Sequence, residues 1–368
     1  MSNGTRTRGR AIVAGAGMVG LSAALSLRRA GFEVAVRERA PHIRETGAAL
    51  GVWQHTITEL ERLGLGPRLS EIKAEQNFQR VRGPSGAVLD VAGMPPGRVV
   101  HRQRLSALLV SAVGEENIRT GKEVVGYTED EVGVTVHYAD GERERGDLLV
   151  GADGLNSHVR RKLIPGSESH YYEEGHHVWR AVLPFDGDLG DGCATVGHHR
   201  TRGTVTRLAD GSCFWVLAQF GVTGEFAGSP KQEAVARVEN LHDGPSRFVL
   251  REVVLATPED AVMDNQVAVV PEIPRWKSHR VVLAGDAAHA MSPHIGSGAS
   301  LGIEDAYVLG DRLSRADLGP ALDSYQTDRI ARYRQVRWHA KAMAIAPTPV
   351  SYVERFSRYL NWLNTTAA

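Results

Sequence analysis

Short apolar runs separated by glycine-rich and polar turns predict the first elements of the chain. Residues 11–14 are apolar, GAGMVG follows at residues 15–20, and apolar residues recur to about Arg29 before a second apolar run at 34–37. Strand, glycine turn, helix and strand in this order are typical of a βαβ unit. The sequence therefore predicts that the chain begins as a parallel α/β domain.

The middle of the chain alternates polar and apolar residues with the period of strands. GVTVHY at 133–138 precedes an Asp140-Gly141 turn typical of a hairpin, and DLLVGADG has the pattern of a buried strand. Between about 168 and 220, turns bound three segments that predict an antiparallel sheet: HVWRAVLPF, TVTRLAD and SCFWVLAQF. A substrate is expected to lie against this sheet.

The end of the chain returns to the first pattern. A strand, RVVLAG, begins near residue 280, a long helical pattern follows, and a final amphipathic helix is expected beyond Pro349 from Val353, Phe356, Leu360 and Leu363. We predict an α/β fold in which a Rossmann-like nucleotide-binding domain is interleaved with a β-rich antiparallel-sheet substrate region and followed by C-terminal helices. The expected boundaries are 1–167 and 276–368 for the two parts of the nucleotide-binding domain, with the helices in the second part, and 168–275 for the β-rich region.

Composition and charge exclude some classes of protein. Of 368 residues, 42% are hydrophobic, and 43 basic residues balance 43 acidic ones. This balance matches a globular enzyme and offers no basic excess for nucleic acid. Cys193 and Cys213 are too far apart for a C-x-x-C motif. The two separate cysteines favour a reducing compartment, so we expect a cytoplasmic protein. Arg28-Arg29 ends the first apolar run before it could span a bilayer, so we expect no membrane span. The balanced charge predicts no nucleic-acid partner.

The glycine spacing at the first turn has a physical reason at each position. Gly15 permits the tight turn, Gly17 lets the backbone approach a pyrophosphate, and Gly20 lets the helix pack on the strand. The free N–H groups and positive dipole at the start of the helix then favour phosphate binding. Glu38, about 20 residues further on, is placed to accept ribose hydroxyls. The turn predicts a dinucleotide but does not separate NAD from FAD.

A second motif, GDAAHAMSP at residues 285–293, bears on the choice of cofactor. Asp286 follows an apolar strand, where its carboxylate can accept a hydroxyl such as one of a ribityl chain. With the glycines that follow it, this segment resembles the GDAAHxxxPxxGxG motif of the FAD-dependent aromatic hydroxylase family, the single-component class A flavin monooxygenases. The matching residues are Gly285, Asp286, Ala287, Ala288, His289, Pro293, Gly296 and Gly298.

Two further segments are similar to the same family. DLLVGADGLNSHVR matches its DGxxSxxR segment, to which FAD and NAD(P)H binding are attributed, at Asp153, Gly154, Ser157 and Arg160. Arg102 matches a family arginine that precedes an apolar helix and reaches toward the flavin. The resemblance spans about residues 11–313 and implies FAD as the cofactor, bound by residues of these motifs.

The resemblance also implies an activity. NAD(P)H as co-substrate would reduce FAD, and the reduced flavin would use O₂, through a C4a-hydroperoxide, to hydroxylate a small aromatic or other electron-rich organic substrate. Epoxidation, Baeyer–Villiger oxidation and a flavoprotein without oxygen transfer are alternatives on the same scaffold. The W-x-W-x-I-P segment of flavin-dependent halogenases is absent from the sequence.

Other site residues are hypotheses from position alone. His294 is a candidate base near the flavin, and four sheet residues are candidates for the substrate pocket, although strand alternation leaves half of them facing elsewhere: Trp179, Arg180, Phe214 and Trp215. Arg160 is expected to be partly exposed and to bind a phosphate of NAD(P)H. The adjacent pairs His176-His177 and His198-His199 would point to opposite faces of a strand, so no metal site is expected.

Two positions depart from the family pattern. Ser297 stands between two glycines where many relatives have Gln, and Gln54-His55 fills the place of a usual Pro-Asn pair. These differences put the expected flavin contacts at both positions in question.

Overall fold

A five-stranded parallel sheet is the centre of the first region. The computed structural model describes residues 8–43, 49–76, 80–91, 97–190, 193–224, 226–244 and 247–366. In spatial order, the strands are β20 (Val281–Leu283), β12 (Leu148–Gly151), β1 (Arg10–Ala14), β2 (Glu33–Arg37) and β8 (Ile118–Arg119). All neighbours pair in parallel. Because such a sheet is covered on both faces, strand β12 is buried at every residue, as the sequence predicted for DLLVGADG.

Helices α1 (Met18–Arg29) and α9 (Gly298–Arg315) pack closely against each other in this region. Glycines on α9 make this possible, because a Cβ atom on Gly302 would overlap Val19 and one on Gly310 would overlap Ser26. Further helices of this part are α2 (Gln54–Leu60), α3 (Gly66–Ile72), α4 (Arg102–Val113), α5 (His158–Leu163) and α8 (Asp286–His289), with a π-helical turn at Glu61–Leu65 between α2 and α3.

Smaller sheets flank the parallel sheet. Strands β9 (Val124–Glu129), β10 (Val134–Tyr138) and β11 (Arg143–Gly146) form an antiparallel meander. Strand β7 (Gly97–His101) pairs with β3 (Ala49–Val52) and β4 (Lys73–Gln76), and β13 (His170–Tyr171) pairs with β19 (Ala268–Val269). The meander includes the predicted hairpin, with β10 and β11 joined through Asp140-Gly141.

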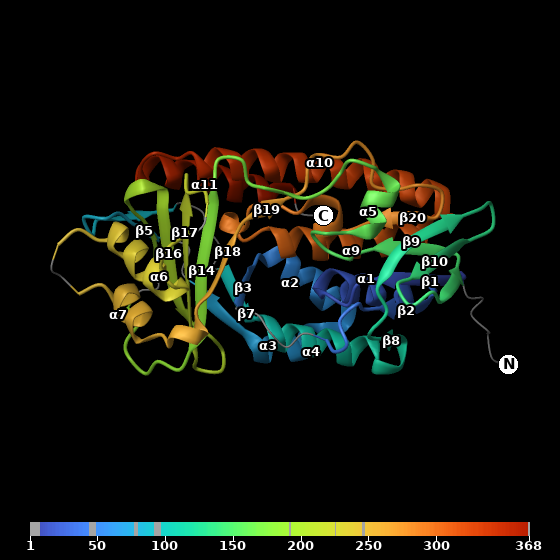
Figure 1. Ribbon diagram of the computed structural model, residues 1–368, viewed down its shortest axis with the longest axis horizontal. Coiled ribbons are helices and arrows are strands. Elements are labelled where there is room, and N and C mark those ends of the chain that lie inside the picture. Colours follow the sequence, from blue (N-terminus) through green and yellow to red (C-terminus); the bar gives the residue numbers. More distant parts are fainter. Residues whose placement is uncertain are drawn as a thin grey trace.

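A seven-stranded sheet forms the second region. Its order is β18 (Met263–Gln266), β14 (His176–Leu183), β17 (Cys213–Phe220), β16 (Thr201–Arg207), β15 (Ala194–Val196), β5 (Arg80–Arg82) and β6 (Val88–Asp90). Helices α6 (Pro230–Val238) and α7 (Val249–Ala256) cover its outer face, away from α1 and β1 (Figure 1). The expected boundary at 167 did not anticipate β5 and β6, which leave the first segment to join this sheet, β5 in parallel with β15.

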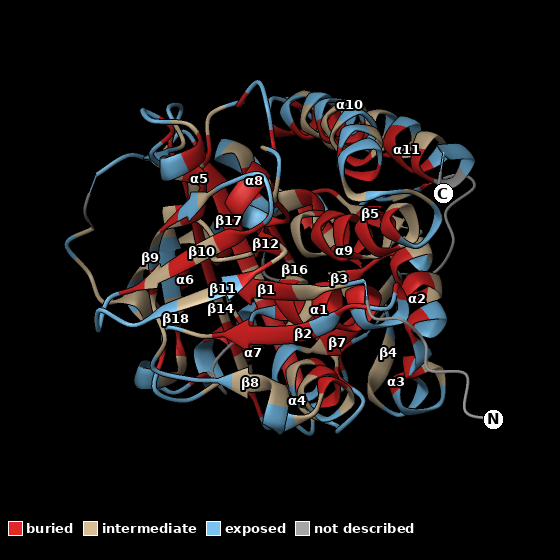
Figure 2. Ribbon diagram, turned by 90° about the vertical axis from the view of Figure 1, so that its right-hand side faces the viewer, coloured by how far each residue is buried: buried red, intermediate tan, exposed pale blue. Residues whose placement is uncertain are grey.

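Two C-terminal helices connect the regions. Helices α10 (Leu318–Ala344) and α11 (Pro349–Thr366) run across the top of both regions in Figure 1. The predicted amphipathic pattern of α11 is confirmed, since Phe356, Leu360 and Leu363 are buried. Figure 2 shows β1 and β2 buried, while the outward sides of α4 and α10 are exposed. Among the described residues, no helix is both long and apolar enough to cross a bilayer.

Candidate active site

The first glycine turn lies at the carboxyl end of β1, and its geometry agrees with the predicted roles. Gly15 has a φ of +102°, which favours glycine, and a Cβ atom on Gly20 would overlap the carbonyl oxygen of Gly15. A Cβ atom on Gly17 would meet nothing within 4 Å. The protein itself therefore does not require glycine at position 17, which leaves room beside the first turn of α1 for a ligand to approach the backbone.

Glu38 lies beside this turn, directly after β2. Its Oε2 accepts a hydrogen bond from the backbone N–H of Ala16 at 2.8 Å, and its Oε1 accepts one from Ala40 at 2.9 Å. These bonds hold the carboxylate against the turn. Each oxygen keeps a second lone pair, which fits the predicted contact with ribose hydroxyls.

The carboxyl end of β20 begins the segment 285–298, which we call the GD loop. The backbone N–H of Gly285 donates to Oδ2 of Asp305 at 2.9 Å, and Nε2 of His289 lies 2.6 Å from the same oxygen. Nε of Arg329 donates to the other carboxylate oxygen at 2.7 Å. His289 thus supports the GD loop from inside the protein, as the sequence suggested.

Asp286 in the GD loop points outward. Its side chain is exposed, and it has no hydrogen-bond or ion-pair partner within the part of the chain that the structure describes. The strand ends β20, β12, β1 and β2 are neighbours in the parallel sheet, so Asp286, Gly17 and Glu38 lie along one edge. A free carboxylate, an open backbone and a second carboxylate on this edge fit an extended dinucleotide such as FAD.

The segment after β12 is held internally. Asp153 accepts hydrogen bonds from the hydroxyl of Ser157 at 2.5 Å and from the backbone N–H groups of His158 at 2.8 Å and Val159 at 3.2 Å. Burial raises the pKa of Asp153, although these bonds oppose the shift. Asp153 therefore organises the start of α5.

The expected exposure of Arg160 is wrong. The side chain is 0% exposed, and its three nitrogens donate to the carbonyl oxygens of Ser167 at 2.9 Å, Ala287 at 3.1 Å and Leu155 at 2.8 Å. A guanidinium engaged in this way has no free face for the phosphate of an external nucleotide. Its bond to Ala287 instead joins the segment after β12 to the GD loop.

The end of the GD loop leads into α9. Pro293 is exposed, Gly296 has a φ of +63°, and a Cβ atom on Gly298 at the start of the helix would meet nothing within 4 Å. Ser297 turns away from this opening, because its Oγ lies 2.5 Å from the hydroxyl of Tyr359 and accepts from Nε1 of Trp53 at 3.1 Å. The unusual serine thus connects the GD loop to α11.

Arg102 and Arg180 lie near each other on facing elements. Arg102 is exposed at the start of α4, and Arg180 on β14 donates from Nη1 to the side chain of Asn265 at 2.7 Å. Burial lowers the pKa of Arg180, and the charge of Arg102 lowers it further. Arg180 therefore lies on the face of its sheet that is turned toward Arg102 and the first region.

Two of the four predicted sheet residues point the other way. Trp179 and Trp215 are 0% exposed and pack in the core under α6 and α7, where Nε1 of Trp215 donates to the hydroxyl of Thr257 at 2.9 Å. Their prediction as substrate-site residues is wrong, because alternation places them on the outer face of the sheet. Phe214 lies on the inner face, where it packs with Val99 of β7.

His294 is tied to the protein through both ring nitrogens. Its Nε2 lies 2.9 Å from the carbonyl oxygen of Ala340, and its Nδ1 lies 2.6 Å from Oγ of Ser292. Burial, with the charge of Arg202 and with His176, lowers the pKa of His294 well below 6.5. This geometry leaves neither nitrogen open to a substrate, which argues against the predicted role as a base in direct contact with it.

The sequence analysis assigned no cofactor or substrate role to two residues beside this loop, His176 and Arg202. His176 on β14 lies with Nδ1 2.8 Å from Oγ of Ser292, and its ring stacks on Phe220 at 4.0 Å between centroids. The guanidinium of Arg202 lies over the rings of Phe220 and Tyr352, at 5.2 and 4.5 Å from their centroids. Alternation of His176 and His177 was the one sequence signal that could have assigned His176 to the inner face.

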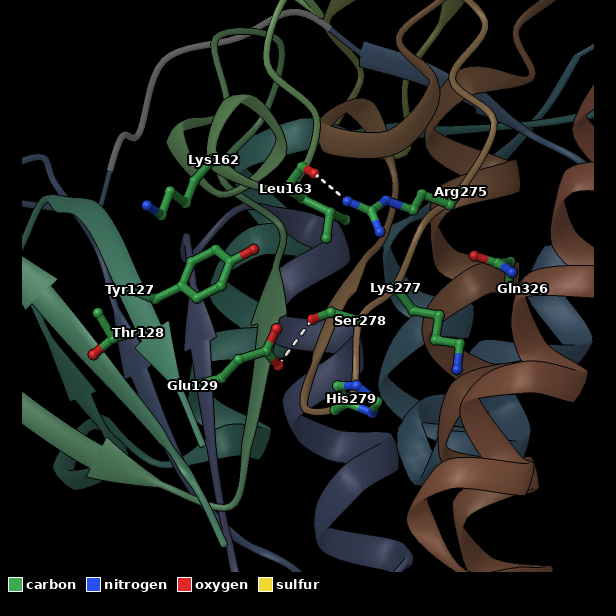
Figure 3. Close-up of a pocket in the computed structure, with 10 residues that line it drawn as sticks. All are labelled: Tyr127, Thr128, Glu129, Lys162, Leu163, Arg275, Lys277, Ser278, His279 and Gln326. Atoms are coloured by element: carbon green, nitrogen blue, oxygen red, sulfur yellow. Dashed lines mark hydrogen bonds between the residues drawn. The ribbon is translucent and has the colours of Figure 1, made fainter. Parts of the chain in front are cut away.

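A surface pocket of about 680 Å³ lies elsewhere, among β9, α5, α10 and the segment before β20 (Figure 3). It is rich in basic side chains, but Arg275 donates to the carbonyl oxygen of Leu163 at 2.9 Å and Lys277 pairs with Asp323 at 2.6 Å. Because the pocket adjoins the amino end of β20, it is separate from the site at the carboxyl ends of the strands.

Known proteins resemble this chain along most of its length. A family model described as FAD binding domain matches residues 9–340. Aurachin C monooxygenase/isomerase of Stigmatella aurantiaca is 31% identical over 334 residues, which cover 87% of this chain and 85% of the relative. 3-Hydroxybenzoate 6-hydroxylase 1 of Aquipseudomonas alcaligenes is 30% identical, with 96% of each chain covered. The crystal structure of Klebsiella pneumoniae HpxO with FAD and uric acid is 25% identical, has a TM-score of 0.83, and covers 97% of this chain and 96% of its own.

Proposed function

Because this chain belongs to the FAD-dependent aromatic hydroxylase family and is an FAD-dependent monooxygenase, we propose that it uses NAD(P)H and O₂ to hydroxylate a small aromatic or other electron-rich organic molecule. The names of relatives support a ring as the substrate, since they include 3-hydroxybenzoate 6-hydroxylase 1 and 6-hydroxynicotinate 3-monooxygenase.

One hydrogen bond carries this proposal. Oγ of Ser292 in the GD loop lies 2.8 Å from Nδ1 of His176 on β14. The loop that follows the predicted FAD carboxylate, Asp286, therefore contacts the inner face of the seven-stranded sheet. A flavin placed beside the GD loop would lie next to a substrate on that face, which is the proximity that oxygen transfer requires.

The chain would hold FAD with groups that are open at one edge of the parallel sheet. The N–H groups at the start of α1 would bind the pyrophosphate beside Gly17, Glu38 would accept ribose hydroxyls, and Asp286 would accept a ribityl hydroxyl. When bound, FAD would supply the redox chemistry, by accepting hydride from NAD(P)H and activating O₂.

The inner face of the sheet would orient the substrate and exclude water. It carries Phe214, Val216 and Ala218 on β17, and Val178 on β14. His176 and Arg202 lie beside Phe220 at one end of this face, and Arg180 lies further along β14 on the same face. An apolar wall with polar side chains at fixed places would hold a flat ring in one orientation and keep water from the reacting carbon.

Oxygen uptake by the FAD-loaded protein tests the proposed function. NADH or NADPH is supplied with a panel of hydroxylated benzenes and pyridines, and consumption of the nicotinamide and of O₂ is followed together. We expect at least one compound to increase both rates in step. A protein that binds FAD but shows no stimulated consumption with any compound would contradict the proposal.

A further inference from the structure

The proton positions between the GD loop and the sheet follow from one carbonyl group. The oxygen of Ala340 can only accept, so Nε2 of His294 must donate to it. The low pKa of His294 leaves the ring neutral, and Nδ1 is then an acceptor. The hydroxyl of Ser292, 2.6 Å away, therefore donates its proton to this nitrogen.

The same reasoning fixes the state of His176. Since Ser292 uses its one proton toward His294, its oxygen accepts from Nδ1 of His176 at 2.8 Å. Burial, followed by the charges of Arg202 and His177, lowers the pKa of His176 to about 3, so this ring is also neutral. Its Nε2 is then a lone-pair acceptor. The side chain is 0% exposed, and among the described residues this nitrogen has no hydrogen-bond partner.

Arg202 supplies the complementary groups. Its Nη2 donates to the carbonyl oxygen of Met343 at 2.5 Å, but Nε and Nη1 are buried without a partner within the described part of the chain. The residue is 7% exposed, and among the described residues no carboxylate forms an ion pair with it. Burying such donors without an acceptor is costly, so a bound acceptor would stabilise them.

Both residues lie on the same face and share one neighbour. His176 pairs with Phe220 across β14 and β17, and Arg202 pairs with Ala218 across β16 and β17, so alternation puts all four side chains on the inner face. The rings of His176 and Phe220 stack, and the guanidinium of Arg202 lies over Phe220. An unpaired acceptor and two unpaired donors thus flank one aromatic ring.

We propose that His176 and Arg202 recognise the polar edge of the substrate ring, by binding a hydroxyl or lactam group that donates one hydrogen bond to Nε2 of His176 and accepts one from Arg202. This inference rests on the proposed function and narrows its substrate class to rings with a neutral O–H or N–H donor beside an acceptor. A carboxylate alone would satisfy Arg202 but leave His176 unpaired. Ser292 and His294 act as positioning residues, because they hold the proton of His176 on Nδ1.

Calorimetric titration of the oxidised, FAD-loaded protein tests this recognition with two matched pairs of probes. The pairs are phenol with anisole and 2-pyridone with N-methyl-2-pyridone, in each of which a methyl group replaces the hydrogen of the donor, and the His176→Phe variant below separates loss of the donor from the added bulk of the methyl group. We expect the donor to improve affinity about tenfold in at least one pair, because its loss leaves a buried acceptor unpaired. Tighter binding of phenol than of anisole indicates that the site recognises a hydroxyl group. Tighter binding of 2-pyridone than of its N-methyl derivative indicates that the site recognises a lactam.

Two variants separate the roles. His176→Phe keeps a ring to stack on Phe220 but removes the acceptor, so the affinity ratio within each pair should fall to within about twofold. His177→Phe is the matched control, because His177 faces the other side of β14 and pairs with Asp264 at 2.9 Å, and it should keep the preference. Arg202→Met should weaken all four probes about tenfold while preserving the ratios.

The inference is overturned if the wild-type protein shows no preference in either pair, or if His176→Phe retains it. Because His176→Phe does not alter Arg202, this test stands even where Arg202→Met fails to fold. The titration requires neither NAD(P)H nor O₂, so absence of turnover would count against the proposed function and not against this result.

Discussion

The carboxylate of Asp305 and the imidazole of His289 form a fully buried pair, with Oδ2 2.6 Å from Nε2. Asp305 comes from α9 and His289 from the GD loop, so this pair fixes the loop to the helix. Burial alone would raise the pKa of Asp305, but the nearby charges of His289 and Arg329 and its hydrogen bonds lower it below 3.8. The site of the predicted cofactor is thus held by a charged network beneath it.

Asp305→Asn should destabilise the protein by about 3–5 kcal/mol, because it leaves Arg329 partly uncompensated in the interior. Urea unfolding and FAD titration would measure the loss of stability and of cofactor affinity. The stabilisation by ionised Asp305 is present above the pKa that Asp has in the unfolded chain, and it is lost as pH falls through the lower pKa of the folded protein. The difference in free energy of unfolding between the wild type and the variant should therefore narrow in acid. Asp311→Asn, at a surface pair on the same helix, is the control. Equal loss in both variants would contradict this account.

Two glycines of the first turn should respond differently to alanine. Gly20→Ala places a Cβ atom on the carbonyl oxygen of Gly15, so the melting temperature should fall whether or not FAD is present. Gly17→Ala meets only open space, and its φ of −71° suits any residue, so the apoprotein should keep its stability. Its affinity for FAD should nevertheless fall, because the methyl group occupies the approach of the pyrophosphate. Thermal unfolding with and without FAD measures both effects. If the Gly17→Ala variant binds FAD normally, the pyrophosphate does not lie beside Gly17.

Arg160→Met should lower both stability and FAD retention. The substitution removes the three hydrogen bonds that the buried guanidinium donates to the carbonyl oxygens of Leu155, Ser167 and Ala287. Loss of these donors should lower the free energy of unfolding by about 3 kcal/mol or more. Steady-state kinetics of FAD-loaded protein should give an unchanged KM for NAD(P)H. Arg161→Met, at a more exposed neighbouring side chain, should change neither property. A raised KM with normal stability would restore the original role of Arg160 in nucleotide binding.

Glu59 on α2 should make stability fall as pH rises. The side chain is 2% exposed, its Oε2 has no partner among the described residues, and burial with the charge of Glu304 raises its pKa from 4.5 to about 9. Between these pKa values, the folded protein binds a proton that the unfolded chain releases, which lowers stability by about 1.4 kcal/mol per pH unit.

Glu59→Gln removes this dependence. Relative to the wild type, the stability of this variant should therefore be about 2–3 kcal/mol greater at about pH 8 than at about pH 6, as measured by urea titration of the free energy of unfolding. Glu61→Gln, at an exposed position close by, should show no such difference. Parallel pH profiles of wild type and Glu59→Gln would mean that Glu59 is ionised in the folded protein.

The sequence located the elements and turns that depend on local chemistry. Glycine and aspartate at strand ends have few alternative explanations, so the turn at 15–20, Glu38 and the GD loop were found together with β1, α1 and β2. Strand alternation also separated two faces of β14 and β17. It could not decide which face turns inward, and for this reason Trp179 and Trp215 were assigned to the wrong side.

The sequence could not predict which residues far apart in the chain contact each other. The burial of Arg160 depends on a carbonyl oxygen 127 positions away, and β5 joins the second sheet through β15, far along the chain. The acceptor on His176 follows only from a hydrogen-bond chain that begins at Ala340, and the unpaired donors of Arg202 only from its folded surroundings. Neither residue belongs to a motif that a sequence pattern could reveal.

Incorporation of isotopically labelled dioxygen into product is the most direct test of the central claim. The FAD-loaded protein is supplied with NAD(P)H, labelled O₂ and each ring compound that stimulates nicotinamide consumption, and the products are analysed by mass spectrometry. Our account predicts a hydroxylated ring that carries one labelled oxygen atom from O₂. Stimulated consumption that yields only hydrogen peroxide, or a product whose new oxygen comes from water, would contradict it.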